Sequence, residues 1–166
     1  MYILDNTVGS SKRIRETALA YIAGFLDGDG CIKARIEKKP DNIFGFQTRI
    51  LVSFTQHTRN RHVLDWIKNQ LKTGSIADYP SKRMSEYVIY NNKFIERLLK
   101  GLRPYVVNKV KQLELSLQLL SLTDRYKNEK SFKEAIGIAE KIRSSNNYPK
   151  KIFFSSPVTT YMEGTG

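Results

Sequence analysis

Two aspartates that follow an apolar helix are the residues of this sequence best suited to chemistry. Asp27 and Asp29 stand one residue apart in the run Ile-Ala-Gly-Phe-Leu-Asp-Gly-Asp-Gly, residues 22–30. The helix dipole disfavours exposed carboxylates at a C-terminal helix end by about 0.3 to 1 kcal/mol each. We therefore expect a cationic partner, and an oxygen-only site of this kind suits Mg²⁺.

Residues 27–30, Asp-Gly-Asp-Gly, also have a purely structural interpretation. Asp and Gly favour tight turns, so the segment taken alone is most simply a turn. A calcium-binding EF-hand loop is disfavoured, because with Gly30 as its invariant glycine the first and twelfth ligand positions fall on Phe25 and Ile36. The interpretation of the aspartates then depends on the partner that the rest of the chain binds.

The charge balance indicates a polyanionic partner. Of 166 residues, 28 are Lys or Arg and 16 are Asp or Glu, so the formal net charge is +12. A hydrophobic fraction of 40% suits one compact domain. One cysteine, Cys31, excludes an internal disulfide, and with only His57 and His62 beside it a zinc finger is excluded too.

The chain shows neither a secretory signal pattern nor an apolar run near the roughly 20 residues of a membrane-spanning helix. We expect an intracellular protein without membrane contact, in an organelle or a prokaryotic cytoplasm. Residues 17–144 are expected to form a single domain, after an N-terminal arm at 1–16. A polar basic tail at 145–166, with Lys150 and Lys151, is expected to follow.

Hydrophobic periodicity predicts an α+β fold. Apolar residues nearly all round predict a buried helix at 17–27, and strict alternation predicts strands on either side of the turn at 38–42. Later elements are expected as a helix at 63–71, a hairpin at 74–90, a helix ending near Gly101, a longer helix opened by Pro104 and reaching Leu120, and a last helix at 132–142. The order αββαββα, followed by further helices, predicts an antiparallel four-stranded sheet backed by helices on one face.

Small residues mark one face of the first predicted helix. Ala20, Gly24 and Gly28 recur every four residues, and such a face lets another backbone approach closely. A second copy of this helix is a natural partner, and such a pair would be a homodimer. The expected interface contacts are Ala20, Ala23, Gly24 and Asp27.

The segment 22–30 closely resembles the LAGLIDADG motif of the homing endonucleases. It departs from that motif only at Ile22, Phe25, Leu26 and Gly28, all mild changes. The resemblance extends from about Tyr21 to Ile142, with two further local matches at residues 54–56 and 104–109. The sequence looks like the single-motif, homodimeric branch of this family, some of whose members are encoded in introns.

The resemblance implies a magnesium-dependent endodeoxyribonuclease with named site residues. Asp29 and the backbone carbonyl of Gly28 would hold the metal, and Asp27 would cap or orient the helix end. Gln56 would hold the attacking water, and Lys109 would polarise the water network or stabilise developing charge. Mn²⁺ is expected to substitute for Mg²⁺, whereas Ca²⁺ is expected to support binding without cleavage.

A basic residue near the end of the second strand usually assists in this family. Here Arg59 and Arg61 flank Asn60, so a shift of one residue in the alignment decides between them.

Outward-facing strand positions mix hydrogen-bond donors and acceptors, which can pair with base edges in the DNA major groove. The expected DNA contacts are Lys33, Arg35, Glu37, Gln47, Arg49, Ser53, Tyr79, Lys82, Arg83, Glu86 and Val88. Strands of about nine residues at roughly 3.3 Å each cover about nine base pairs. Two copies then imply a pseudo-palindromic double-stranded target of roughly twenty base pairs.

Two other functions share the expected fold and charge. An intron maturase would bind RNA and assist splicing, and a regulator would bind DNA without cleaving it. The presence of Asp29, Gln56 and Lys109 favours cleavage over both.

Overall fold

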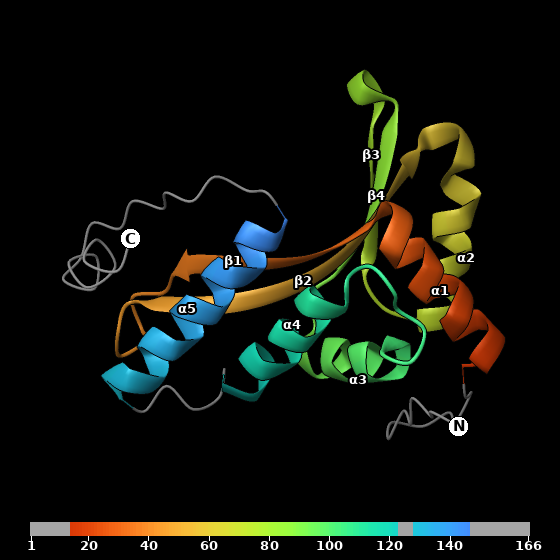
Figure 1. Ribbon diagram of the computed structural model, residues 1–166. Helices are drawn as coiled ribbons and strands as arrows, with labels where there is room; N and C mark the ends of the chain where they lie inside the picture. The colour runs from red at the N-terminus through yellow and green to blue at the C-terminus, as the bar shows by residue number, and fades with distance from the viewer. Residues whose placement is uncertain (1–13, 123–127, 147–166) are drawn as a thin grey trace.

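An antiparallel four-stranded sheet with helices on one face organises the molecule (Figure 1). The computed structural model describes residues 14–122 and 128–146. The elements are α1 (Glu16–Asp29), β1 (Gly30–Lys38), β2 (Phe46–His57), η1 (Thr58–Asn60), α2 (Arg61–Leu71), β3 (Ser75–Tyr79), η2 (Pro80–Lys82), β4 (Met84–Ile89), α3 (Asn92–Leu102), α4 (Val110–Leu122) and α5 (Glu129–Ser145). This order confirms the predicted αββαββα arrangement with further helices.

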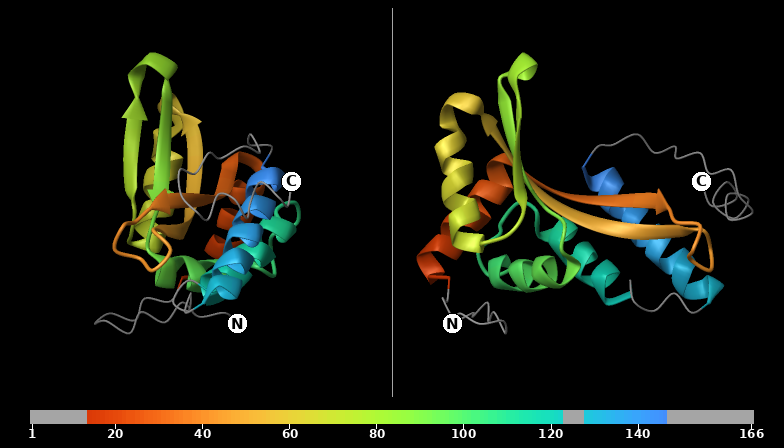
Figure 2. Two further views of the ribbon diagram at one scale, coloured as in Figure 1. Left: turned by 90° about the vertical axis from the view of Figure 1, so that its left-hand side faces the viewer. Right: turned by 180° about the vertical axis from the view of Figure 1, so that it is seen from behind.

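The strands lie in the order β1-β2-β4-β3, and each neighbouring pair is antiparallel. Because the β1–β2 register pairs Gly30 with Phe54 and Lys38 with Phe46, the two strands form a long ribbon. The shorter β3–β4 hairpin stands upright at one end of this ribbon, so the sheet bends between the two parts (Figure 2).

Alternation along the strands determines which sheet face is buried. In β2 the side chains of Ile50, Val52 and Phe54 lie in the core, as the period of two predicts. They pack in one cluster with apolar residues of α1, such as Ile22 and Leu26. Each of the helices α1 to α5 contributes to this cluster, so these helices occupy one face and leave the other face open (Figures 1 and 2).

A glycine lets the chain pass directly from α1 into β1. A Cβ on Gly30 would lie 2.7 Å from the Cα of Leu26, closer than real Cβ contacts. The two aspartates are therefore held at a sharp junction between helix and strand, where the polypeptide reverses onto the sheet.

The prediction that Pro104 opens a long helix is wrong, because α4 begins only at Val110. Residues 103–109 form turns in which the backbone amides of Tyr105 and Val106 donate to the carbonyl of Leu102. The next three amides are directed at a carboxylate of α1 instead of continuing a helix, as described below.

Most of the predicted N-terminal arm and basic tail, residues 1–13 and 147–166, lies outside the described residues. Those two predictions therefore stay predictions. Within the described ranges, no helix has both the length and the apolar character needed to cross a membrane.

Candidate active site

The carboxylate of Asp27 joins two segments that are about eighty residues apart. Its Oδ2 accepts hydrogen bonds from the backbone N–H groups of Val107 at 2.7 Å and Asn108 at 3.0 Å, and its Oδ1 accepts one from Lys109 at 3.0 Å. Partial burial acts to raise the pKa of Asp27, but the three amides and the charge of Lys109 outweigh it, so that the pKa is lowered. The expected cationic partner of Asp27 is therefore the positive N-terminal end of α4 together with Lys109.

The side chain of Lys109 lies at the same helix end. Its Nζ donates to the backbone carbonyl oxygen of Asp27 at 2.7 Å, so one residue contacts Asp27 through both its main chain and its side chain. The last carbonyls of a helix lack partners within the helix, and an ammonium group there is favourable. This contact fixes a positive charge beside the two motif aspartates.

Asp29 has a different environment from Asp27. Its side chain is exposed, and its Oδ2 accepts a hydrogen bond of 2.7 Å from Nε2 of Gln56. The β1–β2 register explains the contact, because Gly30 pairs with Phe54 and the end of β2 therefore lies beside the end of α1. The structure thus brings Gln56 to Asp29. The hydrogen-bond partner of the Asp29 carboxylate is therefore an uncharged amide and not the expected cation.

Asn60 was not among the predicted site residues, yet it contacts this pair. Its Nδ2 donates to Oε1 of Gln56 at 3.3 Å. The only sequence signal for this contact is that residues 56 and 60 are four apart. That spacing does not predict a contact until the short helical turn η1 after β2 is known.

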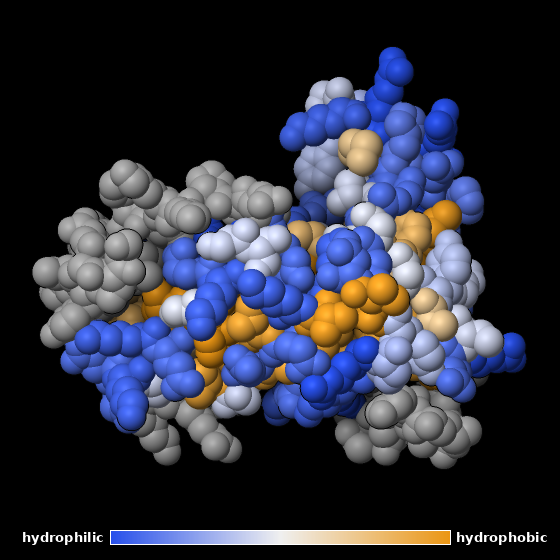
Figure 3. Space-filling view, in the orientation of Figure 1, coloured by the Kyte–Doolittle hydropathy of each residue, from blue (hydrophilic) through white to orange (hydrophobic). Residues whose placement is uncertain are grey.

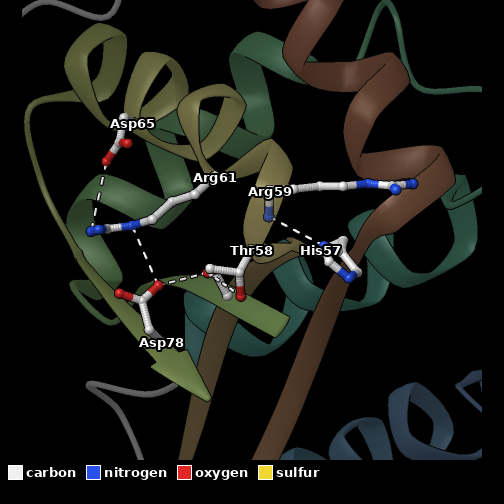
Figure 4. A network of polar contacts seen from close by, with 7 residues as sticks. His57, Thr58, Arg59, Arg61, Asp65 and Asp78 are labelled. Carbon is white, nitrogen blue, oxygen red and sulfur yellow. Dashed lines mark hydrogen bonds and ion pairs between the residues drawn. The ribbon is translucent and has the colours of Figure 1, made fainter. Parts of the chain in front are cut away.

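The two neighbouring arginines differ in their surroundings. The guanidinium of Arg61 forms ion pairs with Asp78 at 3.4 Å and Asp65 at 3.8 Å, whereas that of Arg59 points away from both (Figure 4). Arg61 is therefore held on the side of α2 and β3. Of residues 59–61, Asn60 is the one whose side chain bonds to Gln56.

Comparison with known proteins identifies the family. The model of the LAGLIDADG endonuclease family matches residues 22–122, which is more than half of the chain. The chain belongs to the LAGLIDADG endonuclease family. This match covers the second part of α1, the complete sheet, and the residues Asp29, Gln56 and Lys109 named by the family resemblance.

Individual LAGLIDADG proteins are similar over most of the chain. DNA endonuclease I-CvuI of Chlorella vulgaris is 27% identical over 147 residues, covering 89% of this chain and 91% of its own. DNA endonuclease I-CreI of Chlamydomonas reinhardtii is 35% identical over 104 residues, 61% of each chain. A crystal structure of I-CvuI in complex with its target, in the presence of 2 mM Ca, has a TM-score of 0.78 and 26% identity, covering 90% of this chain and 94% of that one.

The donor set at the motif end of this LAGLIDADG chain fits an oxygen-liganded divalent cation. Asp29 offers an exposed carboxylate, and Gly28 is exposed beside it. Among the residues that the structure describes, no group of three or more His, Cys, Asp or Glu side chains could hold a metal. A cation at Asp29 would therefore be completed by other oxygen ligands, such as the backbone carbonyl of Gly28 and water.

The small-residue face of the motif helix is partly as predicted. Ala20, Gly24 and Gly28 are exposed, and a Cβ on Gly24 or Gly28 would meet nothing within 4 Å. The prediction that Ala23 is a contact of the dimer interface is wrong for this conformation, because Ala23 is completely buried in the protomer's own core. Asp27 is half-buried and already bonded to the loop before α4, so its carboxylate is engaged within the protomer.

The open sheet face presents most of the predicted DNA contacts in an ordered array. Lys33 forms an ion pair of 2.9 Å with Glu86 across β2, and Glu37 accepts a hydrogen bond of 3.1 Å from Gln47. Arg49 lies 3.6 Å from the same Glu37 carboxylate. These side chains are already oriented by one another before any ligand binds.

The other predicted contacts differ in exposure. Arg35, Tyr79, Lys82 and Arg83 are exposed, and Val88 is half-buried. Ser53 is only 2% exposed, because in the register it lies between Cys31 of β1 and Val88 of β4. The prediction that the Ser53 hydroxyl is available to a base is therefore wrong for this conformation.

The β3–β4 hairpin gives the molecule a shape that suits a binding surface. In the space-filling view the upright hairpin stands above the rest of the described molecule with a hollow beside it, and the hairpin is mostly hydrophilic (Figure 3). The exposed Lys82 and Arg83 lie at its turn.

Proposed function

We propose that this protein is a homing endonuclease that recognises a long double-stranded DNA site and hydrolyses one phosphodiester on each strand. One observation carries the proposal: the second motif carboxylate, Asp29, is exposed and bonded to Gln56 where the motif helix meets the sheet. A nuclease needs such an acid beside the DNA-binding face, whereas a DNA-binding regulator gains nothing from it. The names of the two endonuclease relatives support the same activity.

The proposed chemistry assigns each site residue a task. Asp29 and the Gly28 carbonyl would hold a divalent cation, which when bound supplies charge neutralisation and a more acidic water. Gln56 would orient the attacking water with its amide, and Lys109 would stabilise negative charge that develops on the phosphate. We propose Mg²⁺ as the cation, with Mn²⁺ substituting and Ca²⁺ supporting binding alone.

DNA recognition is proposed for the open sheet face. β1 has nine residues and β2 has twelve, a ribbon that fits the major groove and spans roughly nine base pairs. The mixture of Lys33, Glu37, Gln47 and Arg49 offers both donors and acceptors to base edges. The crystal structures of I-CvuI with DNA targets support this use of the fold.

A homodimer is proposed through the exposed face of α1. One protomer supplies one Asp29, so cutting both strands requires two copies, and a two-fold axis then demands a pseudo-palindromic site of roughly twenty base pairs. Gly24 and Gly28 leave open space that their own protomer does not fill, which suits a closely packed second helix.

The substitution Gly24→Leu tests this interface. The side chain has room within the protomer, and leucine favours a helix over glycine by about 0.8 kcal/mol, so the protomer should fold. Because the bulk would separate the two α1 helices, we expect a shift from dimer to the 19.2-kDa monomer in light scattering and loss of double-strand cleavage.

Gly137→Leu is the matched control, since Gly137 lies in the helix α5 and a Cβ added there would also meet nothing within 4 Å. It should leave the dimer intact. A dimer that persists in Gly24→Leu would contradict the proposed interface.

The activity itself is tested with a randomised DNA library and purified wild-type protein in Mg²⁺. We expect selective cleavage of sequences that share a site of roughly twenty base pairs. Retention of specific DNA without cleavage would instead support a regulator, and specific retention of intron RNA alone would support a maturase.

A further inference from the structure

We propose that Asn60 is a positioning residue that fixes which end of the Gln56 amide faces Asp29. The inference rests on the proposed function of Gln56. The three side chains form one chain of hydrogen bonds, with Asn60 Nδ2 donating to Gln56 Oε1 at 3.3 Å and Gln56 Nε2 donating to Asp29 Oδ2 at 2.7 Å.

The direction of this chain follows from the chemistry of its members. An ionised carboxylate only accepts hydrogen bonds, so the end of Gln56 that faces Asp29 must be its NH₂ group. The carbonyl oxygen of Gln56 then points the other way and needs a donor. Asn60 supplies that donor, and no acceptor-only side chain at position 60 could do so.

The backbone that carries Asn60 is itself held in place. Asn60 ends the turn η1, whose first residue, Thr58, donates its backbone N–H to the Arg83 carbonyl at 2.9 Å. The Arg59 N–H donates to Nδ1 of His57 at 3.2 Å (Figure 4). The Ser85 hydroxyl lies 3.3 Å from that of Thr58. A turn tied to β4 in this way can hold Gln56 in one orientation.

The cleavage rates of two variants distinguish a positioning role of Asn60 from simple space-filling. Asn60→Asp keeps the shape but replaces the donor with a second acceptor, which competes with Asp29 for the Gln56 NH₂ group. Asn60→Ala removes the donor without that competition. We expect the single-turnover cleavage rate on saturating DNA to fall on the order of tenfold in Asn60→Ala and further in Asn60→Asp. A space-filling role predicts the opposite ranking.

Asn69→Asp controls for the added negative charge, because Asn69 is an exposed residue of α2. Its cleavage rate should stay within about twofold of wild type, as expected for a substitution on the surface that does not touch Gln56. DNA affinity measured with Ca²⁺ should be similar in wild type and Asn60→Ala, because the residue acts on the reaction through Gln56.

A second measurement needs neither metal nor DNA. The two Nε2 protons of Gln56, assigned by their absence in Gln56→Glu, should shift in the NMR spectra of metal-free Asn60→Ala and Asn60→Asp but not in Asn69→Asp. Unmoved Gln56 signals, or Asn60→Asp cleaving faster than Asn60→Ala, would overturn the inference. If the wild type cleaves no DNA while the Gln56 signals move, the positioning contact stands and the proposed function fails.

Discussion

Asp29→Asn is expected to abolish DNA cleavage while leaving the fold and DNA binding intact. The asparagine oxygen can still accept the hydrogen bond from Gln56, so the contact at the end of β2 survives. What is lost is the negative charge that would hold a divalent cation, and we expect the single-turnover rate to fall at least about a thousandfold. Cleavage in Mg²⁺ and binding in Ca²⁺ should be measured on the same DNA site.

Asp65→Asn is the matched control, because it makes the same chemical change at an exposed residue of α2. It should cleave at nearly the wild-type rate. If Asp29→Asn retained more than about a tenth of the wild-type rate, Asp29 could not be the metal ligand that the proposed mechanism requires.

Asp27→Asn should destabilise the protein rather than remove a group that reacts. The carboxylate accepts three backbone hydrogen bonds, whereas an asparagine NH₂ group would face amide donors. We expect a loss of about 1.5 to 3 kcal/mol in the free energy of unfolding, measured by urea denaturation at pH 7. Cleavage should also fall, because the loop that carries Lys109 loses its anchor.

The pH dependence of this loss has a defined sign. The folded-state pKa of Asp27 lies below its ordinary value of 3.8, so its stabilising effect is fully present above pH 3.8 and is lost as the pH falls through the folded-state pKa. The stability difference between wild type and Asp27→Asn should therefore be constant near neutrality and shrink below about pH 4. Asp41→Asn, at an exposed turn, should show little difference in stability from wild type at pH 7. If the stability difference between wild type and Asp27→Asn grew on acidification, the lowered pKa of Asp27 would be contradicted.

The order of elements followed from local patterns, because hydrophobic periodicity depends only on neighbours along the chain. The strand alternation of β2 placed Ile50, Val52 and Phe54 on the core face correctly. Local patterns failed at Pro104, where a residue suited to a helix start lies instead in a turn. There a carboxylate of α1 competes for the amides that a helix would use.

Burial was less predictable than secondary structure. Ala23 and Ser53 were both expected at a surface, yet the structure buries both. Small side chains carry little hydrophobic signal of their own, so the neighbouring elements decide whether they are covered. Ser53 is enclosed by strands that lie on each side of β2.

The sequence by itself determined the motif helix, the two aspartates after it, the strong positive charge and, through the family resemblance, Gln56 and Lys109. Only the tertiary structure decided that the aspartates differ: Asp27 is bonded to amides about eighty residues away, while Asp29 is exposed and bonded to Gln56. It alone also added Asn60 to the site. The physical reason is that hydrogen bonds between distant segments depend on strand register and turn geometry, which leave no periodic trace in the residues themselves.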